Sequence, residues 1–154
     1  MIHLLLKWLH IISSTVLFGT GAGIAFFMWR THRSQDVRVI AAVAADVVRA
    51  DFLFTATAVV VQPLTGFLLV RELGLPVTLP WIHAAIWLYV LVGCCWLPVV
   101  WLQIRMRDIA RRAVAEGVAL PPEYHRYFKL WFLLGWPAFA GVLAIFWIMI
   151  ARPF

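Results

Sequence analysis

The sequence predicts an all-α integral membrane protein, a four-helix bundle with helical extensions on the cytoplasmic side. Two observations predict this fold class. The chain is 64% hydrophobic and 13% charged, whereas a soluble domain is about 45–50% apolar and about 25% charged. The apolar residues are also gathered into four runs, each long enough to cross a hydrocarbon core about 30 Å thick. This composition excludes a soluble globular enzyme, a disordered chain and a disulfide scaffold.

Each apolar run is expected to be a helix, because a backbone in lipid must satisfy its own hydrogen bonds. The 154 residues leave room for four spans and short connections in a single domain, with no separate soluble domain. The expected spans lie at about residues 4–29, 52–70, 81–102 and 130–150.

The connections differ in composition. Residues 34–51 are rich in Ala and Val and contain no Gly or Pro, so they are expected to extend the second span as a helix, with Ser34 as N-cap. Residues 71–80 contain one Gly and two Pro and predict a short turn. Residues 104–123 begin as a basic helical extension of the third span, and Gly117 is expected to end it.

The basic residues predict the orientation. The net charge of +6 comes from cations that flank the apolar runs, which indicates membrane orientation and no nucleic acid partner. The first and third connections carry most of these cations and are therefore expected in the cytoplasm. Both termini then face outward, which is the periplasm for a bacterial inner membrane. Ten of the 13 basic residues belong to these two connections: Arg30, Arg33, Arg38, Arg49, Arg105, Arg107, Arg111, Arg112, Arg126 and Lys129.

Polar residues inside the runs mark candidate sites, because they are costly in a membrane helix. Lys7, His10 and Ser14 recur at helical spacing on the first span, and this face is expected to point into the bundle. His10 lies about 9 Å into the span, and His83 begins the third span on the same outer side. The other candidates near this pocket are Gln62, Arg71 and Trp136.

This arrangement matches the needs of a haem, which takes one or two imidazole ligands, an apolar slot and cations near its propionates. His10 and His83 are then the expected metal ligands. The alternatives without metal also follow from the residues. His10 can hydrogen-bond Ser13, Ser14 or Gln62 across helices, and His83 can lie among lipid headgroups.

The opening segment LLLKWLHIISSTVLFGTGAGIAFFMWRTHR resembles the first span of HemJ-type protoporphyrinogen oxidases, which begin with Lys-x-x-His-Ile-Ile; Lys7 and His10 match that Lys and His. The tail GWPAFAGVLAIFWIMIARPF is similar to the last span of that superfamily through Pro137, Arg152 and Pro153. The chain is also similar to a sister family of small bacterial four-helix membrane proteins. HemJ-type enzymes carry haem b, so the resemblance implies haem b as the cofactor.

The resemblance is incomplete at two places. The third span ends in Trp101-Leu102-Gln103, where HemJ-type enzymes have an aromatic residue and a histidine. The last span lacks their acidic residue before Pro137. The resemblance therefore implies haem binding rather than protoporphyrinogen oxidation.

Three functions remain open from the sequence. The first is electron transfer by haem b or a HemJ-like oxidoreductase, with a membrane redox partner or a quinone. The second is a non-catalytic accessory subunit, in which Lys7, His10 and Gln62 only fix helix packing. The third is a small transporter, although no inverted repeats are present. The small residues from Gly19 to Gly23 are compatible with a homo-oligomer in the lipid bilayer.

Overall fold

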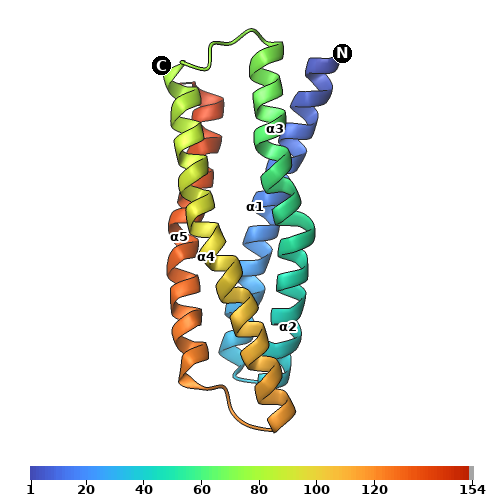
Figure 1. Cartoon of the computed structure of the whole chain (residues 1–154), viewed down its shortest axis with the longest axis vertical. Coiled ribbons are helices and arrows are strands. Elements are labelled where there is room, and N and C mark those ends of the chain that lie inside the picture. Colours follow the sequence, from blue (N-terminus) through green and yellow to red (C-terminus); the bar gives the residue numbers. More distant parts are fainter. Residues whose placement is uncertain (153–154) are drawn as a thin grey trace.

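The computed structural model describes residues 1–152, and every secondary-structure element in this range is a helix (Figure 1). Four helical stretches are long and apolar enough to cross a membrane. This confirms the predicted fold class. Pro153, which the tail resemblance uses, lies outside the described residues. The elements are α1 (Ile2–Ser34), α2 (Val37–Ala50), η1 (Asp51–Thr55), α3 (Ala56–Glu72), α4 (Pro80–Glu116) and α5 (Pro122–Ala151).

The second stretch runs without a break from α2 through η1, a turn of π-helix, into α3. The predicted helical extension of the second span is therefore confirmed. Its expected N-cap at Ser34 is wrong, because α1 continues through that residue and the Ser34 hydroxyl donates to the Thr31 carbonyl at 2.7 Å. Asp36 caps α2 instead, and its carboxylate accepts the backbone N–H groups of Arg38 at 2.9 Å and Val39 at 3.3 Å.

The basic helical extension of the third span also forms as expected. α4 continues to Glu116 and ends at Gly117, which has a φ of 66°. This left-handed conformation is easily adopted by glycine, which has no Cβ. α5 then starts with Pro122, where a missing N–H costs little because the first turn has no acceptor for it. The start of α1, the end of α5 and the 73–79 link lie at one end of the bundle (Figure 1).

The hydrophobic core is concentrated in the basic half of the bundle, away from the termini. α2 packs there against α1 and α4, so its Ala-rich face is buried inside the bundle and does not project on its own. Toward the termini the helices pair as α1 with α3 and α4 with α5 (Figure 1). The main core cluster contains Ile24, Met28, Ile40, Ala41, Ala44, Val47, Leu102, Met106, Ile109, Ala110, Tyr124, Phe128 and Trp131.

One hydrogen bond joins α4 to α3 at a proline. Pro63 lies inside α3 and has no N–H, so the carbonyl of Val59, one turn earlier, lacks its helical donor. The hydroxyl of Tyr89 on α4 donates to that carbonyl. The tyrosine therefore compensates for the donor that the proline removes.

We expect Tyr89→Phe to lower the free energy of unfolding by about 1 kcal/mol, because it leaves the Val59 carbonyl unpaired. Thermal unfolding in detergent measures the change. The same substitution in a Pro63→Ala background should cost much less, since alanine at that position supplies a backbone N–H. Equal losses in both backgrounds would contradict this interpretation.

Candidate functional site

Two side-chain hydrogen bonds join α1 to α3 near the terminal end of the bundle. His10 Nδ1 lies 2.9 Å from Thr65 Oγ1, and the Ser13 hydroxyl donates to Gln62 Oε1. Ser13 and Thr65 are buried, whereas His10 and Gln62 are half-buried. We call these four residues the α1–α3 polar seam.

The hydrogen bonds of Thr65 favour one tautomer of His10. Thr65 Oγ1 lies 2.8 Å from the Val61 carbonyl and 3.1 Å from the Gln62 carbonyl, and both can only accept. When the single hydroxyl proton points to one of these carbonyls, Thr65 accepts from His10 Nδ1–H. His10 Nε2 then carries the lone pair, and it has no hydrogen-bond partner among residues 1–152.

Close packing fixes the position of the imidazole ring. A Cβ placed on Gly66 would lie 3.2 Å from His10 Cε1, which is closer than ordinary van der Waals contact. The ring therefore occupies space that a larger residue at position 66 would need. Ligating histidines in proteins show the same pattern, with one ring N–H donated to a fixed acceptor and the other nitrogen free to bind.

The other predicted site residues are placed differently. Ser14 was expected on the inward face, but its hydroxyl donates to the Ile11 carbonyl of its own helix at 2.8 Å; Ser13, one residue earlier, points into the seam instead. Trp136 was expected near the pocket and is 65% exposed, against Phe132. The exposed position of Trp136 gives no support to its predicted place near the pocket. Lys7, Arg71 and His83 are all exposed.

The expected convergence of His10 and His83 receives no support from the contacts of the described residues. His10 bonds to α3, whereas His83 on α4 is exposed and makes no side-chain hydrogen bond among them. Residues 1–152 also contain no group of three His, Cys, Asp or Glu side chains that could hold a bare metal ion. A single imidazole is sufficient for a haem, which brings its own four nitrogens.

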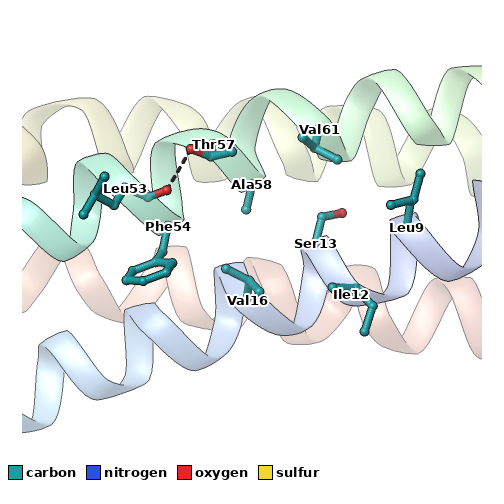
Figure 2. A pocket seen from close by; sticks show the side chains of 9 residues that line it. All are labelled: Leu9, Ile12, Ser13, Val16, Leu53, Phe54, Thr57, Ala58 and Val61. Atoms are coloured by element: carbon teal, nitrogen blue, oxygen red, sulfur yellow. Dashed lines mark hydrogen bonds between the residues drawn. The ribbon is translucent and has the colours of Figure 1, made fainter.

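A narrow groove lies beside the seam, between α1 and the η1–α3 segment (Figure 2). Its volume of about 180 Å³ is below the roughly 300–1,000 Å³ of pockets for drug-sized ligands. The Thr57 hydroxyl in its wall donates to the Leu53 carbonyl at 2.8 Å. The groove is thus too small to enclose a haem. Its lining is Leu9, Ile12, Ser13, Val16, Leu53, Phe54, Thr57, Ala58 and Val61.

One protein-family model matches almost the whole chain. The family model of predicted integral membrane proteins (DUF2269) matches residues 4–153. The chain belongs to the DUF2269 family. No curated protein and no solved structure matches it, and none of the comparisons supports the predicted likeness to HemJ-type enzymes.

One buried residue of this DUF2269 protein was missed in the sequence. Asp51 was expected at the end of a cytoplasmic extension, but it is 4% exposed and lies in η1, inside the bundle. The spacing of small and polar residues in the sequence could have indicated that Asp51 is buried. Small and polar residues recur every three or four positions along this stretch, the period of one helix face. They are Ala41, Ala44, Val48, Asp51, Thr55, Ala58, Gln62 and Thr65, of which all but Gln62 are buried.

Proposed function

We propose that this protein binds haem b through His10 Nε2 and transfers electrons in the membrane. The observation that carries the proposal is the position of His10: a half-buried imidazole in an apolar span, with Nδ1 2.9 Å from Thr65 Oγ1 and no side-chain hydrogen bond at Nε2 among residues 1–152. An ionisable residue in a membrane helix is by default a candidate functional group. The resemblance of the Lys7–His10 segment to HemJ-type enzymes supports the same cofactor.

The cations at the terminal end support the proposal further. Lys7 and Arg71 are exposed, and neither takes part in the two ion pairs formed among residues 1–152. They are therefore available to the propionates of a haem held by His10. When bound, the haem would supply one-electron chemistry, and the partner would be a quinone or another membrane redox protein. Bis-histidine ligation would require His83 as the second ligand.

A second candidate function is that of a non-catalytic subunit of a membrane complex. The observation in its favour is that His10 and Ser13 both form hydrogen bonds across the α1–α3 seam. In this function the imidazole holds two helices together and has no ligand. Cross-helix hydrogen bonds in membranes contribute only about 0.6 kcal/mol on average, so this role alone does not require a histidine.

The visible spectrum of the full-length protein separates the two functions. The protein is purified in detergent from haem-replete cells, and its reduced-minus-oxidised spectrum is recorded. We expect the absorbance bands of a b-type haem. A colourless protein would refute haem binding and leave the accessory-subunit function.

We also propose that the basic end of the bundle faces the cytoplasm of a bacterial inner membrane. The support is the placement of ten of the 13 basic residues in the first and third connections. A phosphatase fused after residue 154 should be active, and one inserted at Gly117 inactive. The reverse pattern would place His10 in the cytoplasmic leaflet.

A further inference from the structure

Asp51 is a buried carboxyl group in the interior of the bundle. It is 4% exposed, and its Oδ1 accepts from Trp96 Nε1 on α4 at 3.4 Å. Trp96 lies nine residues before Arg105, which is about 13 Å along the helix at 1.5 Å per residue. Asp51 is therefore at the depth of the apolar part of α4 and away from the basic end.

No cation accompanies this carboxyl group. The ion pairs formed among residues 1–152 are Arg49 with Asp46 and Arg107 with Asp108, and neither involves Asp51. An ionised carboxylate in such surroundings is costly without a counter-ion. A neutral, protonated carboxyl avoids that cost.

The surroundings of Asp51 on every neighbouring helix are uncharged. α1 has no titratable residue between His10 and Arg30, α3 has none before Arg71, and α5 has none between Lys129 and Arg152. On α2 the nearest charges, Asp46 and Arg49, are exposed and paired with each other. On α4 the titratable residues between His83 and Arg105 are Tyr89, Cys94 and Cys95.

Two unpaired polar atoms, on Asp51 and Thr55, indicate where a proton can bind. Asp51 Oδ2 is buried and has no hydrogen-bond partner, and the same is true of Thr55 Oγ1. Both residues belong to η1, and π-helical turns inside α-helices are frequent at functional sites. A proton on Oδ2 converts this atom from an unpaired acceptor into a donor, while Oδ1 keeps its bond from Trp96.

From this geometry we infer that Asp51 is a membrane-embedded proton-binding site, formed by its carboxyl group with Thr55 and Trp96, that takes up and releases one proton. The inference does not depend on haem binding at His10. A monovalent metal ion is the competing ligand, and only one acidic side chain is present to hold it. The proton is thus the ligand that this set of groups fits.

Infrared spectroscopy of the full-length protein in detergent tests the site, because a protonated carboxyl has a C=O stretch distinct from that of a carboxylate. At neutral pH the wild type should show this band, and in D₂O the band should shift as the proton exchanges. Asp51→Asn should remove it. The matched control is Asp46→Asn in α2, the helix that precedes η1. The Asp46 side chain is 74% exposed, so this variant should leave the band unchanged.

A third variant protects the test if Asp51→Asn fails to fold. Trp96→Phe removes the hydrogen bond to Oδ1 and should move the C=O band to higher frequency without abolishing it. The inference would be overturned if the wild type showed no protonated band at neutral pH, or if the band persisted in Asp51→Asn. A band that did not shift in D₂O would also overturn it. So would a band that is present in choline chloride and lost in sodium chloride. The last would identify a sodium site.

Discussion

If the protein binds haem b as proposed, replacing His10 with alanine is expected to abolish its haem absorbance completely. His10 is the only histidine of α1 within its apolar part, since His3 is exposed at the terminus and His32 lies at the basic end. His10→Asn should also give colourless protein, because an amide can hydrogen-bond to Thr65 but is a poor haem ligand. The measurement is haem content per polypeptide with the reduced-minus-oxidised spectrum.

Further variants serve as comparisons. His125→Ala, at the basic end, should leave the spectrum unchanged. His83→Ala should retain the haem, with a change from low-spin to high-spin if His83 is the second ligand. Thr65→Val should weaken haem retention by about 10–100-fold, as removal of a partner of a ligating histidine does. Full haem content in His10→Ala would contradict ligation by His10.

Gly141→Ala is expected to destabilise the bundle more than any other single-methyl change in α5. A Cβ at this position would lie 2.6 Å from Val92 Cγ2 on α4, so the Val92 side chain or the two helices would have to move. Overpacking of this kind costs about 1–3 kcal/mol. Thermal unfolding in detergent measures the loss.

Gly135→Ala is the matched control on the same helix, because nothing lies within 4 Å of a Cβ there. It should be neutral or stabilising through its higher helix propensity. Val92→Ala should restore much of the stability of Gly141→Ala. Equal effects of the two glycine substitutions would show that α4 and α5 are not packed closely at Gly141.

Composition and hydropathy are sufficient to predict the four helices and their order, because a chain in lipid has few alternatives to helices. The extensions were also predictable, since residues 34–51 and 104–116 contain no helix-breaking residue. The hydropathy pattern does not predict which helices α2 packs against. The composition of α2 predicted a helical extension of the second span on the cytoplasmic side but did not show that its Ala-rich face is covered by α1 and α4.

The candidate site was only partly predictable for a similar reason. Helical spacing identified His10 but not the rotation of α1, and an error of one residue exchanged Ser14 for Ser13. The partner Thr65 follows from the alignment of α1 with α3, which no local pattern specifies. Asp51 was assigned to the cytoplasm because the apolar run was counted from Phe52, although the helix face that carries it begins near Ala41.

Haem ligation by His10 requires a free Nε2, which it presents when Thr65 accepts Nδ1–H. Nitrogen-15 NMR of histidine-labelled wild-type protein without haem tests this requirement most directly, with the His10 signals assigned by their loss in His10→Asn. We expect the neutral tautomer with a proton on Nδ1, and loss of that preference in Thr65→Val. A proton on Nε2 in the wild type would contradict haem ligation by His10, because the imidazole would then present no lone pair to a haem.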